Sequence, residues 1–176
     1  VIGPDGELTE DMKRRDIRRL SKPSLDTYYI GFNLDDPVLG GNLKLRQALS
    51  CASDPRQWET LNAGRVVGSS GPVPPGIAGR LETPSPFAFN PEKAKALLAE
   101  AGYPNGIDPA TGRRLTLVLD LGRTDQEIRE TAELFASFMD RIGVVVKLQY
   151  NNWPSFLKKI ARREAQMFLL GWMADY

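Results

Sequence analysis

The residues with the clearest chemical potential stand at the end of the chain, behind a short apolar run. Residues 167–172 have the apolar pattern of a buried strand, with Trp172 at its end and Asp175 just beyond it. An indole offers a large apolar wall and one N–H donor, and a shielded carboxylate makes strong charge-assisted hydrogen bonds. This pair suits the binding of a ligand, although an Asp after a strand is also a common turn residue and a Trp a common core residue.

Catalytic chemistry is restricted by the residue types that the sequence lacks. There is no histidine, which excludes Ser-His and Cys-His nucleophiles and removes the commonest transition-metal ligand. The single cysteine, Cys51, excludes an internal disulfide and a Cys-cluster zinc site. Cys51 lies among the apolar residues of an expected helix, which indicates a small buried core residue. We therefore predict no catalytic residue, no cofactor and no metal site.

The composition is that of an ordinary globular chain. Of the 176 residues, 41% are hydrophobic and 26% charged, and 23 basic against 22 acidic residues give a net charge of +1. A dedicated nucleic-acid binder usually carries a clear basic excess, so we expect no nucleic-acid partner. No apolar run approaches the roughly 18 residues that span a bilayer.

The first half of the chain predicts a strand, helices and a long loop. Alternation over residues 28–33 indicates a strand, and a helix is expected over about 43–52. Asp54 and Pro55 are suited to the N-cap and first position of the next helix. Residues 65–90 are rich in proline and glycine but also contain apolar residues, which favours an ordered loop, either as a wall of a ligand cleft or as a structural wrap.

The second half predicts a regular α/β unit. Asn90 and Pro91 start a helix, and from Leu115 onward the order is strand, helix, strand, helix, strand, with a capping box at residues 124–127. This order indicates a parallel sheet with right-handed crossovers. Such sheets bind ligands beyond the carboxyl ends of their strands, where residues 172–176 are expected to lie.

A family resemblance rests on several motifs in a fixed order. They are Tyr-Tyr-Ile-Gly-Phe-Asn at 28–33, Leu-Arg-Gln-Ala-Leu at 45–49, Gly-Pro-Val-Pro-Pro-Gly at 71–76, the helix motif at 90–104 and Gly-Trp-Met-Ala-Asp-Tyr at 171–176. The series resembles the second half of the family 5 solute-binding proteins of oligopeptide, dipeptide and nickel ABC importers. The resemblance implies an α/β fold, one lobe of a type II periplasmic-binding-protein-like fold with a mixed, mostly parallel sheet flanked by helices. It divides the chain into a charged connector at 1–25 and a ligand-binding lobe at 26–176, expected to be partial because the chain stops inside the last motif.

The resemblance also implies a function and a site. A peptide or peptide-like solute would be captured in a cleft between this lobe and a second lobe of the same protein, which is missing here, and delivered to an ABC permease in the membrane. The location would be periplasmic or otherwise extracytoplasmic. In the peptide-binding branch, the Asp that matches Asp175 pairs with the α-amino group of the peptide, and the Trp that matches Trp172 lines the same cleft.

Some positions depart from the family pattern, and other functions stay open. Asn152 replaces an acidic residue before Trp153, and residues 163–166 replace a common Gly-Asp-Phe-Asp sequence. Arg46 is expected to donate hydrogen bonds to the backbone. The same lobe could serve a receptor that presents its ligand to a membrane sensor. A hydrolase that uses only carboxylates, for example Asp120 and Asp175, is the least favoured alternative.

Overall fold

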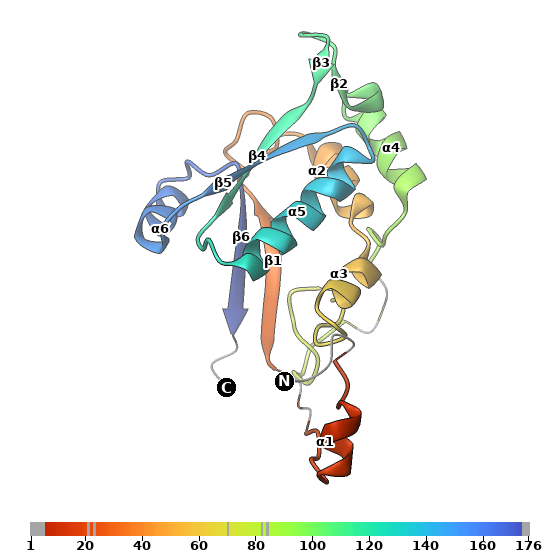
Figure 1. The fold of residues 1–176 in the computed structure, drawn as a ribbon. Helices are drawn as coiled ribbons and strands as arrows, with labels where there is room; N and C mark the ends of the chain where they lie inside the picture. Colours follow the sequence, from red (N-terminus) through yellow and green to blue (C-terminus); the bar gives the residue numbers. More distant parts are fainter. Residues whose placement is uncertain are drawn as a thin grey trace.

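The structure is a computed structural model that describes residues 6–20, 22, 24–69, 71–81, 83 and 85–173. Within these residues the main sheet has four strands in the order β1 (Asp26–Phe32), β6 (Met167–Met173), β4 (Thr116–Leu121) and β5 (Val145–Tyr150) (Figure 1). Strand β4 runs parallel to both β5 and β6, while β1 runs antiparallel to β6. The predicted mixed, mostly parallel sheet is confirmed.

The core forms where β4 is covered on both faces. Leu117, Leu119 and Leu121 alternate along the strand and are fully buried, and Asp120 on the other face is only 2% exposed. Burial on both faces is characteristic of a central strand in a parallel sheet. Helix α5 (Gln126–Asp140) packs its apolar face into the same core, because its apolar residues recur at helical spacing.

Helices α2 (Leu43–Ala52) and α4 (Pro91–Glu100) pack together beside this core. Asn42 caps α2 through a bond from the Leu45 N–H (3.1 Å) and donates to the Ala101 carbonyl behind α4 (2.9 Å). Arg46 is half-buried and its guanidinium donates to the carbonyls of Leu39 (2.5 Å) and Gly40 (2.7 Å), as predicted. Cys51 is buried as predicted, and burial raises the pKa of its thiol.

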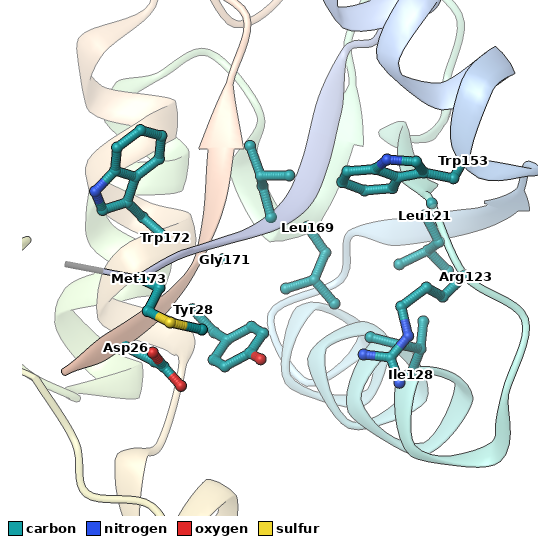
Figure 2. A pocket seen from close by; sticks show the side chains of 12 residues that line it. Asp26, Tyr28, Leu121, Arg123, Ile128, Trp153, Leu169, Gly171, Trp172 and Met173 are labelled. Carbon is teal, nitrogen blue, oxygen red and sulfur yellow. The ribbon is translucent and has the colours of Figure 1, made fainter. Parts of the chain in front are cut away.

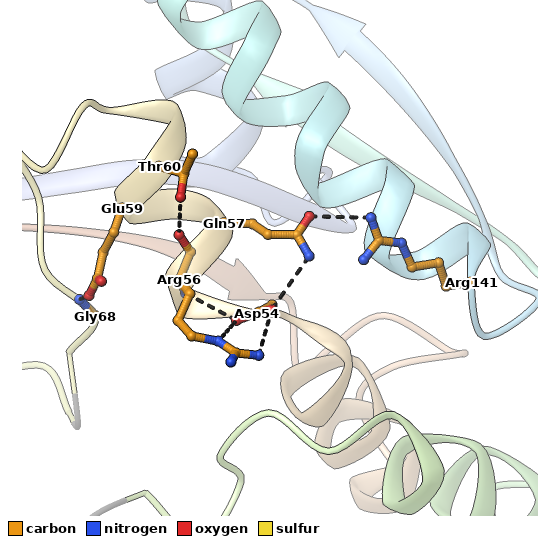
Figure 3. Close-up of polar contacts among 7 residues, drawn as sticks. All are labelled: Asp54, Arg56, Gln57, Glu59, Thr60, Gly68 and Arg141. Carbon is orange, nitrogen blue, oxygen red and sulfur yellow. Dashed lines mark hydrogen bonds and ion pairs between the residues drawn. The ribbon is translucent and has the colours of Figure 1, made fainter. Parts of the chain in front are cut away.

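Helix α3 (Pro55–Leu61) is held in place by the network of hydrogen bonds and ion pairs drawn in Figure 3. The Asp54 carboxylate accepts bonds from the Arg56 N–H (3.0 Å) and the Arg56 side chain (3.2 Å), which confirms the predicted cap. Gln57 joins Asp54 to Arg141, the residue that follows α5, because the Arg141 guanidinium donates to the Gln57 Oε1 atom at 3.2 Å. Burial alone would raise the pKa of Asp54, but the bonds from Arg56 and Gln57 lower it.

The long segment at 65–90 contains no helix or strand in its described part. It is held at several points along the domain: Gly68 donates to Glu59 of α3 (2.9 Å), Thr27 of β1 donates to the Pro72 carbonyl (3.3 Å), and Asn90 donates to the Cys51 carbonyl (2.9 Å). These contacts show an ordered loop that wraps α3 and β1. The expectation that it forms a wall of a ligand cleft stays untested.

Helices α5 and α6 begin near the carboxyl end of the sheet, and each has a side-chain cap. Helix α5 begins one residue later than the capping box predicted, because Asp125 rather than Thr124 accepts the Ile128 N–H (3.3 Å). The charged Asp125 cap also suits the positive end of the helix dipole better than a threonine hydroxyl. Helix α6 (Trp153–Ala161) is capped by Asn152, which accepts the Ser155 N–H at 2.9 Å.

The remaining elements lie at the periphery. Helix α1 (Glu10–Arg14) buries none of its residues and projects away from the sheet in Figure 1. The 3₁₀ turn η1 (Pro104–Gly106) leads into a small hairpin of β2 (Ile107–Asp108) and β3 (Arg113–Arg114). The division into a connector at 1–25 and a lobe at 26–176 stays a prediction. No helix in the described parts of the chain is long and apolar enough to cross a membrane.

Candidate functional site

An open cavity of about 230 Å³ lies at the carboxyl ends of β4 and β6, where they meet the start of β1 and the first turns of α5 and α6 (Figures 1 and 2). This is the position that parallel-sheet topology predicts for a ligand. The cavity is lined by Asp26, Tyr28, Leu121, Gly122, Arg123, Ile128, Trp153, Leu169, Leu170, Gly171, Trp172 and Met173.

Two aromatic side chains stand on opposite sides of this cavity. Tyr28 of β1 is 66% exposed, and Figure 2 shows its ring beneath β6 with the hydroxyl directed toward the middle of the lining residues. Trp153 at the start of α6 is 49% exposed and packs against Phe156, with ring centroids 5.6 Å apart. Large exposed aromatic rings beside a concave surface are typical of binding sites.

The charged groups at the cavity are partly engaged. The Arg123 side chain lies beside Ile128 (Figure 2) and pairs with Asp125 at 2.8 Å. This ion pair, together with the Ile128 N–H, lowers the pKa of Asp125 against the opposing effect of desolvation. At the other side, Ser24 donates to one carboxylate oxygen of Asp26, while the second oxygen is buried and has no hydrogen-bond partner among the residues that the structure describes. The cavity is thus mostly apolar, with a cation on one rim and a carboxylate on the other.

The sequence predicted two ligand-binding residues, Trp172 and Asp175. Trp172 lines the cavity, but it lies within β6, one residue before the strand ends, and not beyond the strand as predicted, because the pairing with β1 extends to Met173. Its ring is 66% exposed and points to the side of β6 opposite Met173 and Tyr28 (Figure 2), as strand alternation requires. Asp175 lies outside the described residues. The ligand-binding roles of Trp172 and Asp175 therefore stay predictions.

Asp120, the other carboxylate considered for hydrolysis, lies buried beneath this end of the sheet. Its Oδ1 atom accepts bonds from Lys159 of α6 (2.7 Å) and from the Asn151 side chain (2.9 Å). Since the carboxylate is 2% exposed and one of its oxygens is shared by Lys159 and Asn151, it ties α6 to β4. The described residues contain no group of three or more metal-ligating side chains.

Several lining residues were missed by reasoning from the sequence. Gly122 and Arg123 directly follow β4, so the rule that pointed to residues 172–176 could have found them. Trp153 was considered only in the motif in which Asn152 departs from the family pattern, although it opens the helix behind the carboxyl end of β5. Tyr28 reaches the site only because β1 pairs antiparallel with β6, which no local pattern predicts.

A second hollow of about 330 Å³ lies at the opposite end of β6, and its polar groups pair with one another. The Asn33 amide donates to the Arg163 carbonyl (2.7 Å), and the Arg163 guanidinium pairs with Asp35 (2.6 Å). Gln166 accepts the Val118 N–H (2.7 Å) and donates to the Asp36 carboxylate (3.2 Å). The polar side chains at this end thus pair with one another, although the hollow itself is open.

The mixed sheet flanked by helices and the open apolar cavity at the carboxyl ends of its parallel strands are features of α/β ligand-binding domains. The sequence pattern of one family, described as bacterial extracellular solute-binding proteins, family 5 Middle, matches residues 3–176. The chain belongs to this family of solute-binding proteins.

Similar proteins bind different solutes. The chain is 31% identical over 160 residues to heme-binding protein A of Haemophilus influenzae, covering 90% of this chain and 28% of that protein. It is 27% identical over 168 residues to the dipeptide-binding protein of Escherichia coli, covering 92% and 29%. The crystal structure of a dipeptide-binding protein from Pseudoalteromonas, in complex with Met-Leu, matches with a TM-score of 0.70 and 29% identity over 86% of this chain and 29% of that one. The chain thus spans less than a third of these relatives.

Proposed function

We propose that this chain is one lobe of an extracytoplasmic solute-binding protein that captures a peptide-like solute and hands it to an ABC permease. The observation that carries the proposal is the cavity at the carboxyl ends of β4 and β6, walled by Tyr28 and Trp153, in a member of family 5. The dipeptide-binding relatives favour a peptide as the ligand. A second lobe of the same protein would close the cavity by a hinge motion.

Proposed roles can be given to Asp175, Arg123 and Trp172. The family motif assigns Asp175 to the ligand's ammonium group, where a shielded charge-assisted bond would reject ligands that lack an amine. The Arg123 guanidinium, on the opposite rim from β1, is placed to meet a ligand carboxylate in competition with Asp125. Trp172 would contact the ligand or the second lobe through its exposed ring.

We propose binding without catalysis. The relatives reported above are binding proteins, and the hydrolase alternative loses one of its two carboxylates, since Asp120 is engaged by Lys159 and Asn151. A role as a ligand-presenting receptor is also not favoured, because the similar proteins include dipeptide-binding proteins. A porphyrin is the second ligand class to test, on the 31% identity to heme-binding protein A.

Native mass spectrometry of the full-length protein, made from its complete reading frame, tests the proposal. We expect a mass released on mild unfolding that fragments as a short peptide, and loss of this mass in Asp175→Asn. The matched control is Asp35→Asn, which changes an exposed carboxylate at the opposite end of the sheet and should retain the ligand. Release of a porphyrin, or turnover of a substrate, would contradict the peptide-binding proposal.

A further inference from the structure

Each of the two aromatic side chains that form the walls of the cavity packs against a glycine. Tyr28 lies directly opposite Gly171 in the β1–β6 register. A Cβ atom added to Gly171 would lie 2.7 Å from the Tyr28 Cε1 atom and 2.9 Å from Cδ1. The Tyr28 ring therefore lies flat against the Gly171 backbone, in space that any other residue would fill.

The opposite wall repeats this arrangement. A Cβ atom added to Gly122, the residue that follows β4, would lie 2.8 Å from the Trp153 Cε3 atom and 2.6 Å from the Phe156 Cδ1 atom. Trp153 also packs against Phe156, with ring centroids 5.6 Å apart, so the two rings together cover Gly122. Neither Gly122 nor Gly171 has a positive φ, so backbone conformation does not require glycine at either position. What requires it is the close approach of the rings.

The size and lining of the cavity indicate what it holds. Its volume of about 230 Å³ exceeds the roughly 150 Å³ of an apolar cavity that binds benzene. It is below the roughly 300–1,000 Å³ of pockets that enclose a whole small ligand. Leu121, Ile128 and Leu169 complete the apolar lining between the two rings. The cavity thus has room for one ring-sized apolar group, with the rest of the ligand outside it.

We propose that the Tyr28–Gly171 and Trp153–Gly122 pairs set the width of a subsite for one bulky apolar side chain of the peptide-like ligand. This inference rests on the proposed function and adds the ligand's side-chain class to it. A methyl group at either glycine would push an aromatic ring into the cavity and exclude a large side chain, while a small one would still fit.

The test uses the full-length protein and four tripeptides, namely Ala-Ala-Ala and the three peptides with one alanine replaced by phenylalanine. Calorimetry should show one phenylalanine peptide binding at least about tenfold more tightly than Ala-Ala-Ala, because burial of the ring contributes more than about 1.4 kcal/mol. In Gly171→Ala and Gly122→Ala, the ratio of the phenylalanine-peptide affinity to the Ala-Ala-Ala affinity should fall about tenfold.

Gly31→Ala is the matched control. Gly31 lies in the same strand pair under the Phe168 ring, where a Cβ atom would come within 2.4 Å, but it does not line the cavity. It should leave the preference unchanged. Tyr28→Ala removes one wall without adding a methyl group and should also abolish the preference, which keeps the test decisive if a glycine variant fails to fold.

The outcomes separate the subsite from the function. Binding of the peptides without a preference for phenylalanine, or equal effects of Gly31→Ala and Gly171→Ala on the preference, would overturn the subsite alone. Failure of every peptide to bind the wild-type protein would overturn the proposed function and the subsite with it.

Discussion

The two ends of β6 differ in how they use their side chains. At its carboxyl end, Tyr28, Trp153 and Trp172 expose large aromatic surfaces around an open cavity. At its amino end, the Asn33 amide donates to the Arg163 carbonyl in the loop after α6, and the Gln166 amide oxygen accepts the Val118 N–H of β4. Since exposed aromatic surface is unfavourable in water and internal hydrogen bonds hold loops in place, the first end is suited to a partner and the second to stability.

Similar local motifs serve different purposes at the two ends of β6. Both ends contain a glycine with an aromatic ring stacked across β1 and β6, Gly171 under Tyr28 and Gly31 under Phe168. Only the first pair borders the cavity at the carboxyl ends of the parallel strands. Position relative to strand direction, rather than the motif itself, separates a candidate binding element from a packing element.

The largest expected effect concerns the buried ion pair beneath the open end. Lys159→Met should leave the Asp120 carboxylate, 2% exposed, with Asn151 as its remaining partner. The free energy of unfolding should fall by about 2–3 kcal/mol, somewhat less than for a fully dry pair because Lys159 is partly exposed. Chemical denaturation of the full-length protein would measure this.

Lys158→Met is the control for that variant, because Lys158 is an exposed neighbour on the same helix. Its effect should stay within about 0.5 kcal/mol. Equal effects of the two substitutions would show that Asp120 does not depend on Lys159, and the open end would then lack the rigid support that we assign to it.

The amino end of β6, where the polar side chains pair with one another, is tested by Gln166→Ala. This change leaves the Val118 N–H and the Asp36 carboxylate without their shared partner. We expect a loss of about 1–2 kcal/mol in unfolding free energy, since unsatisfied polar groups retain their desolvation cost. Peptide affinity should be unchanged, as Gln166 does not line the candidate cavity. A loss of affinity without a loss of stability would reverse the comparison.

The hydrogen-bond network of Asp54, remote from both ends of β6, should make a contribution to the free energy of unfolding that depends on pH. Asp54→Ala removes the α3 cap and should cost about 1 kcal/mol at neutral pH. Because the folded-state pKa of Asp54 is lowered, the contribution of its charge is present above the unfolded pKa of about 4 and is lost as the pH falls through the folded value. The stability difference between wild type and Asp54→Asn should therefore vanish in urea titrations at low pH. A constant difference from pH 7 to pH 3 would contradict this.

The smallest effect is expected at Arg163, which adopts a left-handed conformation with φ of +60° after α6. The N–H groups of Arg163 and Glu164 cap the helix in a glycine-type motif. Arg163→Gly and Arg163→Ala both remove the ion pair with Asp35, but only glycine relieves the backbone. The glycine variant should be more stable than the alanine variant by about 0.5–1 kcal/mol in thermal unfolding. Equal stabilities would show that this turn carries no strain.

Local patterns in the sequence predicted much of the fold. The helix over 43–52, the caps at Asp54 and Asn90 and the alternating strand from Leu115 were found because each depends on neighbouring residues. The start of α5 was placed one residue early because Thr124 and Asp125 are both good caps, and only Asp125 also meets Arg123.

The site was less predictable. Strand order located its position at the carboxyl end of β6, and Trp172 lies there. Tyr28, however, joins the cavity through antiparallel pairing between residues more than a hundred positions apart, and the glycine contacts appear only when both partners are placed. Such non-local packing leaves no periodic signal in one sequence.

Hydrogen–deuterium exchange of the full-length protein, measured with its co-purified ligand and after removal of that ligand, tests whether the cavity at the carboxyl end of β6 is the binding site. We expect the ligand to slow exchange at residues 121–128, 153–157 and 169–173, around this cavity, and to leave exchange at residues 32–36 and 160–166 unchanged. Protection confined to 32–36 and 160–166, or no difference at either end, would contradict the assignment of the cavity at the carboxyl end of β6 as the binding site.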